Sequence, residues 1–104
     1  MTEQKSLLEK IRKAQAALER LERGEGPTEE DLTRAPLLDY WCVVAEGRFV
    51  LLQGLVTGHP KLVDGDFIQT SALLWLAPDR TSARTLSRFY RLGVPWEDLL
   101  NTRQ

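Results

Sequence analysis

Four arginines lie close together near the end of the chain, and their side chains are of the kind that bind anions. They are Arg80, Arg84, Arg88 and Arg91, and Tyr90 lies among them. Planar guanidinium groups form paired hydrogen bonds with phosphate or carboxylate, and an aromatic face can stack on a base. These five residues are the candidate binding site for an anion or a partner. The alternative interpretation is a solvated face whose arginines pair with nearby acids.

The other reactive side chains do not form a pattern typical of catalysis or metal binding. His59 and Cys42 are the only histidine and the only cysteine, and no ligand motif surrounds either. A serine or cysteine nucleophile needs a base within hydrogen-bond reach, and His59 alone could serve. Asp64 and Asp66 flank a glycine, where a turn explains both carboxylates. We therefore expect no metal, no cofactor and no enzymatic activity.

Length and charge limit the class of protein. The chain of 104 residues fits a single domain, and its net charge of −1 gives no bulk attraction for nucleic acid or a membrane surface. No apolar run is long enough to span a membrane, and the charged N-terminus lacks the apolar core of a signal peptide. Together these features predict a cytoplasmic protein that has no membrane partner.

An amphipathic helix is predicted over residues 3–23. Its apolar stripe includes Leu7, Ile11, Leu18 and Leu21, at the alternating spacing of a coiled-coil seam. A capping box at Ser6 favours a start there, although Thr2 would start the helix earlier. A seam of about two heptads is marginal alone. We expect it to pack on the rest of the domain or on a second copy of itself, which would make a homodimer.

Residues 40–92 have mainly the character of β-strands. Aromatic and β-branched residues fill 40–45, a glycine turn leads into 48–56 with a bulge expected at Gly54, and a hairpin is expected between 61–63 and 66–71. Residues 82–92 are ambiguous, because the arginine spacing favours a helix over a strand. A short helix over 95–101, with Trp96 packed inward, closes the chain. The predicted fold is α+β: an N-terminal helix packed on a small antiparallel sheet, with a short C-terminal helix.

The stretch 64–93 carries a motif that resembles a known group of proteins. Thr85, Ser87 and Arg88 begin a T-x-S-R-x-Y-R-L-G signature that ends at Gly93. It resembles a family of short bacterial proteins of unknown function, and it is loosely similar to phage proteins that sequester a signalling nucleotide of bacterial defence. The resemblance implies that residues 83–92 form a strand, and it implies a phage or mobile-element origin in a bacterial host cell.

Three hypotheses of function follow from this sequence. The leading one is a non-catalytic inhibitor of a bacterial defence system, of the anti-CRISPR type, that occludes a larger protein or protein complex. The second is a sponge that sequesters a small signalling nucleotide, gripped by Arg84, Arg88 and Tyr90. The third is an accessory protein that binds nucleic acid, which the net charge disfavours.

Overall fold

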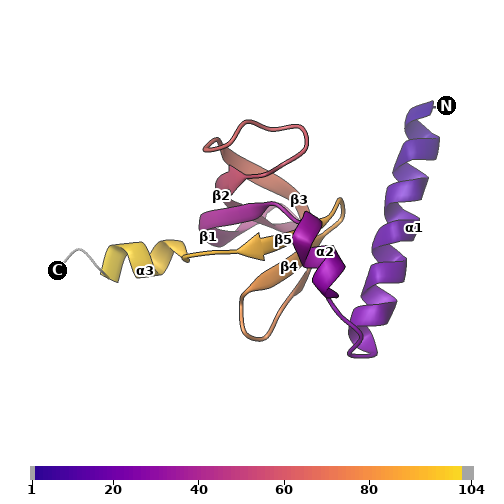
Figure 1. Cartoon of the computed structure of the whole chain (residues 1–104). Helices are drawn as coiled ribbons and strands as arrows, with labels where there is room; N and C mark the ends of the chain where they lie inside the picture. The colour runs from indigo at the N-terminus through magenta and orange to yellow at the C-terminus, as the bar shows by residue number, and fades with distance from the viewer. Residues whose placement is uncertain (1, 102–104) are drawn as a thin grey trace.

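A five-stranded barrel forms the centre of the fold, and helices lie at its side and at its end (Figure 1). The computed structural model describes residues 2–101, with side chains from residue 6 to residue 100. In chain order the elements are α1 (Thr2–Glu22), α2 (Glu29–Arg34), β1 (Leu37–Glu46), β2 (Phe49–Thr57), β3 (Phe67–Leu76), β4 (Ser82–Thr85), β5 (Phe89–Leu92) and α3 (Trp96–Asn101). The predicted α+β class is confirmed, and the sheet closes on itself.

Closure of the barrel depends on one parallel strand pair. Neighbouring strands are antiparallel from β1 through β5, and β5 then pairs in parallel with β1. A bulge at Tyr40 and Trp41 bends β1 opposite Gly54. A Cβ atom at Gly54 would lie 2.7 Å from the backbone oxygen of Asp39, so only glycine fits. The bulge expected at Gly54 therefore lies in the facing strand.

Two apolar clusters stabilise this arrangement. The first fills the barrel and has seven buried members: Leu38, Trp41, Leu52, Val56, Ala83, Tyr90 and Leu92. The second lies between α1 and the outer wall of the barrel, and its buried members are Ala17, Leu21, Ala35 and Phe89. The second cluster decides where α1 lies, and α1 is one wall of the site described below.

Only the C-terminal half of α1 packs on the barrel. Ala14, Ala17 and Leu21 are buried, whereas Leu7 and Ile11 on the same stripe are 50% and 42% exposed. The helix begins at Thr2, which is the earlier of the two predicted starts. The expected packing on the domain is therefore present for part of the seam. A homodimer through Leu7 and Ile11 stays a prediction.

Residues 82–85 and 89–92 form two antiparallel strands, so the strand character implied by the resemblance is confirmed, the single strand over 83–92 is wrong, and the helix favoured by periodicity is wrong. The side chains of Ser82–Thr85 are all buried, and the strand pairs β5·β4 and β4·β3 take up the backbone hydrogen bonds. A helix with one polar face cannot account for a segment buried on both sides. The spacing of the arginines in the sequence could not reveal that Arg84 is buried.

Two smaller expectations are also wrong. Trp96 is 46% exposed rather than packed inward, because α3 extends away from the barrel at the end opposite α1 (Figure 1). Residues 61–63 are not a strand but part of an irregular connection between β2 and β3. Within the described residues, no helix is long and apolar enough to cross a membrane.

Candidate anion-binding site

A cavity of about 270 Å³ lies where α1, α2 and the β4–β5 connection meet. Helix α1 contributes Lys13, and α2 contributes Asp31 and Arg34. The barrel side is formed by β4, β5 and the residues between them: Arg84, Ser87, Arg88 and Phe89. Four of these side chains are basic and one is acidic. The cavity is therefore strongly positive although the whole chain carries a net charge of −1.

Arg84 is the central residue of this cavity. Only 8% of its surface is exposed, and its Nε atom has no hydrogen-bond partner. Among the described residues no carboxylate lies within ion-pair distance of its guanidinium, which instead lies over the Phe89 ring at 5.1 Å. Burial lowers the pKa of Arg84; the charge of Asp31 opposes that effect only in part, and the charges of Arg20 and Arg88 add to it. A buried cation without a counter-charge is costly, so the site favours an incoming anion.

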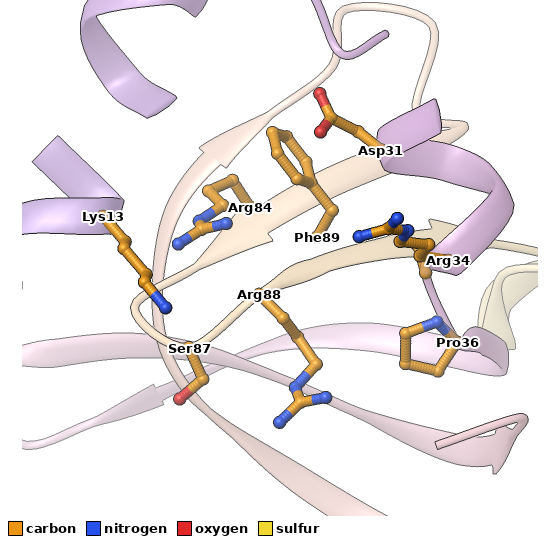
Figure 2. A pocket seen from close by; sticks show the side chains of 9 residues that line it. Lys13, Asp31, Arg34, Pro36, Arg84, Ser87, Arg88 and Phe89 are labelled. Carbon is orange, nitrogen blue, oxygen red and sulfur yellow. The ribbon is translucent and has the colours of Figure 1, made fainter. Parts of the chain in front are cut away.

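Lys13 faces Arg84 across the cavity. Figure 2 shows the two side chains running toward one another, one from α1 and one from the barrel. Lys13 immediately precedes Ala14, which is buried, so the packing of α1 fixes where the lysine begins. No described carboxylate pairs with Lys13. Two uncompensated positive charges therefore approach the same space.

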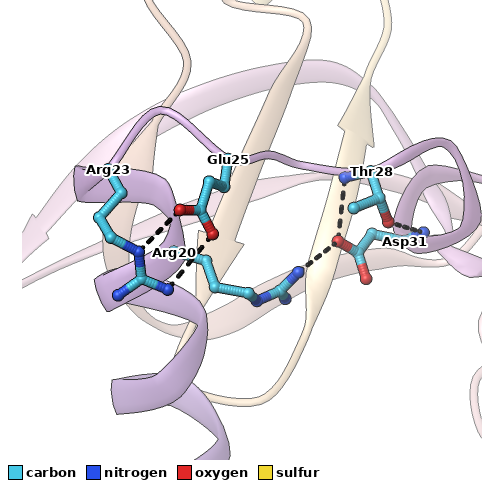
Figure 3. Close-up of polar contacts among 5 residues, drawn as sticks. All are labelled: Arg20, Arg23, Glu25, Thr28 and Asp31. Carbon is cyan, nitrogen blue, oxygen red and sulfur yellow. Dashed lines mark hydrogen bonds and ion pairs between the residues drawn. The ribbon is translucent and has the colours of Figure 1, made fainter.

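The acidic member of the cavity, Asp31, is already engaged (Figure 3). Its Oδ2 accepts a hydrogen bond from the Thr28 amide at 3.0 Å, and the Thr28 hydroxyl accepts one from the Asp31 amide at 3.1 Å. Arg20 lies 3.6 Å from the same carboxylate. Burial raises the pKa of Asp31, but the Thr28 hydrogen bonds and the Arg20 charge outweigh it, so the net shift is downward. Asp31 caps α2 and does not neutralise Arg84.

The β4–β5 connection is organised by Thr85, which is fully buried. Its hydroxyl oxygen accepts hydrogen bonds from the amides of Ser87 and Arg88, both at 3.2 Å, and the hydroxyl donates to the Arg88 carbonyl at 3.1 Å. Ser87 is tied to Ser71 on β3 through a hydroxyl contact of 2.9 Å. These bonds give the connection one conformation and set where Arg88 begins.

Arg88 borders the cavity but does not converge on Arg84. Its side chain runs away from Arg84 and Lys13 (Figure 2), and its buried Nε also has no hydrogen-bond partner. Burial lowers the pKa of His59, and the charge of Arg88 lowers it further, which places this cation within electrostatic reach of the β2–β3 connection. Arg88 therefore adds positive potential on the flank of the cavity.

The remaining predicted site residues lie elsewhere. Arg80 forms an ion pair with Glu97 at 3.1 Å and lies over the Trp41 ring at 4.9 Å. Arg91 is exposed and donates from Nε to the carbonyl of Ala35. Tyr90 is 3% exposed in the barrel core and offers no face for stacking. Of the five predicted residues, the structure brings together Arg84 and Arg88.

Sequence reasoning missed Lys13 and Arg34, because both belong to helices far from the arginine group in the sequence. One signal for Lys13 existed, since it flanks the apolar stripe beside the two alanines that allow close packing of α1. Arg34 is exposed and pairs with Glu30 at 3.2 Å, so it is a rim residue. No group of three or more His, Cys, Asp and Glu side chains in the described ranges is placed to hold a metal ion.

Fold and cavity together define a small α+β barrel protein with a cationic cavity under its N-terminal helix. The chain belongs to the Family of unknown function (DUF6634), whose model matches residues 3–102. That match covers nearly the whole chain, so the helix, the barrel and the cavity all lie within the family region. No curated protein and no solved structure matches the chain significantly.

Proposed function

We propose that this protein is a non-catalytic binding protein that captures a phosphate-bearing ligand in the cavity between α1 and the barrel. The observation that carries the proposal is the burial of Arg84 without a counter-charge. A guanidinium presents five donors in a planar fork that matches the oxygens of phosphate. An anion that entered the cavity would satisfy the orphaned Nε atom and offset the charge.

Binding rather than reaction is proposed because the described cavity residues supply cations and a capping carboxylate. General acid–base chemistry needs a group that exchanges protons near neutral pH within reach of the ligand. The guanidinium of Arg84 stays protonated there, and Asp31 stays ionised because its pKa is lowered. These residues can hold and orient an anion.

This proposal corresponds most closely to the sponge hypothesis, with a change in the residues that grip the ligand. Arg84 and Lys13 replace the predicted set of Arg84, Arg88 and Tyr90, because Tyr90 lies in the core. The inhibitor that occludes a defence complex stays a second proposal. What supports it is the same cavity, because an acidic side chain of a partner protein would also meet the charge of Arg84.

The experiment compares the full-length protein with the Arg84→Met variant by calorimetric titration with inorganic phosphate and pyrophosphate. We expect the wild type to bind and the variant to lose about ten- to a hundredfold in affinity, since a hydrogen bond to a charged group contributes about 1.5–3 kcal/mol. Methionine keeps the length and apolar stem of arginine and removes only the charged fork. Circular dichroism verifies that the variant is folded.

Arg48→Met is the matched control, because Arg48 is exposed in the β1–β2 turn and its loss changes the net charge equally. Equal affinities of wild type and Arg48→Met would show that binding depends on the cavity and not on overall charge. Equal affinities of wild type and Arg84→Met would overturn the proposal. Failure of every phosphate compound, together with saturable binding of an acidic peptide that Arg84→Met abolishes, would favour the occluding inhibitor.

A further inference from the structure

We infer that the cavity takes the dianionic terminal phosphate of a phosphomonoester and does not select the monoanionic phosphate of a diester; this inference rests on the proposed function. The reason is the number of uncompensated charges that approach the same space. Arg84 and Lys13 have no described ion-pair partner, and Asp31 is held by Thr28 and Arg20. A phosphate dianion would therefore neutralise the two positive charges of Arg84 and Lys13.

The burial of Arg84 makes the charge of the ligand matter, because water does not solvate its guanidinium as it does the exposed Lys13. A phosphomonoester carries about −1.5 to −2 near pH 7 because its second pKa is about 6, whereas a diester carries −1. A diester or a carboxylate would compensate only one of the two positive charges, that of the buried Arg84 or that of the exposed Lys13. Arg88 adds further positive potential from the flank of the cavity, which increases the advantage of the dianion.

The number of acceptor atoms leads to the same ligand class. A terminal phosphate offers three unesterified oxygens, while a diester and a carboxylate offer two. The Arg84 fork and the Lys13 ammonium together bring several donors, and the Nε atom of Arg84 has no other acceptor. Three oxygens can meet a fork on one side and an ammonium on the other.

Aromatic recognition is not available in the described cavity, so the phosphate itself must carry the specificity. One face of Phe89 is covered by the Arg84 guanidinium, and the residue is only 7% exposed. Tyr90 is buried in the barrel. The cavity volume of about 270 Å³ lies just below the range that is usual for small-molecule sites. The group attached to the phosphate is therefore held outside the cavity, and its identity contributes little.

The test uses phenyl phosphate and phenyl sulfate, which share shape but differ in charge, with the full-length protein. At about pH 7.5 we expect phenyl phosphate to bind about tenfold more tightly or better, and at about pH 5 we expect the two affinities to converge as the phosphate becomes a monoanion. The charged groups around the cavity are Arg20, Asp31, Arg34 and Arg88, with Glu30 and His59 beyond them. Phenyl sulfate is exposed to the same groups, so the ratio of affinities removes any titration of the protein.

Equal affinities for the two ligands at about pH 7.5, both abolished by Arg84→Met, would overturn the dianion inference and leave the proposed function standing. No binding of either ligand would overturn the proposed function itself. Three further ligands test whether the group attached to the phosphate affects binding: ribose 5-phosphate, adenosine 5′-monophosphate and a trinucleotide with a 5′-phosphate. Similar affinities are expected, and a preference of tenfold or more for the ligands with bases would contradict recognition by phosphate alone.

Discussion

The guanidinium of Arg84 lies 5.1 Å above the ring of Phe89, in a layer between α1 and the barrel where the arginine is only 8% exposed. The ring gives the cation some attraction, worth about 0.5–2 kcal/mol in such pairs. It does not supply a negative charge or a hydrogen-bond acceptor for Nε. The protein thus keeps an arginine in a place where an apolar side chain would be easier to bury.

Replacement of Arg84 by methionine should therefore stabilise the unliganded protein. We expect the free energy of unfolding to rise by about 1–2 kcal/mol, since exchange of buried charges for apolar groups of similar volume is often stabilising. Methionine also keeps a favourable contact with the Phe89 ring. Urea unfolding without added anions measures the change. The Arg48→Met control should stay within about 0.5 kcal/mol of wild type, and a clear loss of stability in Arg84→Met would mean that Arg84 is structural.

A second prediction concerns Thr85, whose hydroxyl holds the β4–β5 connection. Thr85→Val keeps the shape but leaves the part-buried amide of Arg88 without its acceptor, and it leaves the amide of Ser87 with the Ser71 hydroxyl alone. We expect a loss of about 1–3 kcal/mol in stability, as for other buried polar groups left unsatisfied. Thermal and urea unfolding measure it. The control is Thr33→Val in α2, where the hydroxyl donates to the Glu29 carbonyl at the surface and a change within about 0.5 kcal/mol is expected.

The signature that prompted the family resemblance is explained mostly by folding. Thr85 and Ser87 shape a connection, Tyr90 fills the barrel and Arg91 bonds the carbonyl of Ala35. A Cβ atom at Gly93 would collide with the carboxylate of Asp39, whose Oδ1 accepts the Val94 amide at 2.8 Å. Of these residues, Ser87 and Arg88 border the cavity. The motif therefore located the region of the site while pointing to residues that build the barrel.

The sequence predicted structural features that depend on neighbouring residues, and it missed features that depend on contacts between segments far apart in the chain. The helix of α1 and the turn after Glu46 follow from neighbouring residues, and each is present. Closure of the barrel depends on the parallel pairing of β1 with β5, which no local pattern encodes. The cavity needs Lys13 and Arg84, which are brought together only by packing of α1 through Ala17 and Leu21. Spacing alone grouped Arg84 with Arg80 and Arg91, which the fold sends to other surfaces.

A third prediction follows from the lowered pKa of Asp31. Because the folded state holds this carboxylate ionised more strongly than the unfolded chain does, its contribution is fully present above the unfolded value of 3.8 and is lost as pH falls through the lower folded value. Asp31→Asn should reduce stability by about 1 kcal/mol near neutral pH, as expected for loss of a capping charge. When urea unfolding is measured at a series of pH values, the difference in stability between wild type and Asp31→Asn should vanish at the lowest pH. A difference that persists unchanged at the lowest pH would show that geometry, and not charge, makes the cap.

The last prediction uses His59 as a reporter of the cavity. It is the only histidine in the chain, and its ring lies 6.5 Å from that of Tyr90. Burial lowers its pKa below the ordinary 6.5, and the charges of Arg88 and Lys61 lower it further. The folded state therefore binds this proton less readily than the unfolded chain, so stability falls as pH decreases from about 6.5 through the folded value.

Arg88→Gln removes one of the two like charges and should raise the pKa of His59 toward 6.5, whereas Arg48→Gln should leave it unchanged. Phosphate bound in the cavity should also raise it, because the anion offsets the field of Arg88. The ring protons of His59, followed by NMR through a pH titration with and without phosphate, measure both effects. If phosphate moves the pKa in wild type but not in Arg84→Met, the anion that His59 senses is bound at Arg84. If it moves equally in both proteins, the anion binds at Arg88 instead, outside the cavity centre.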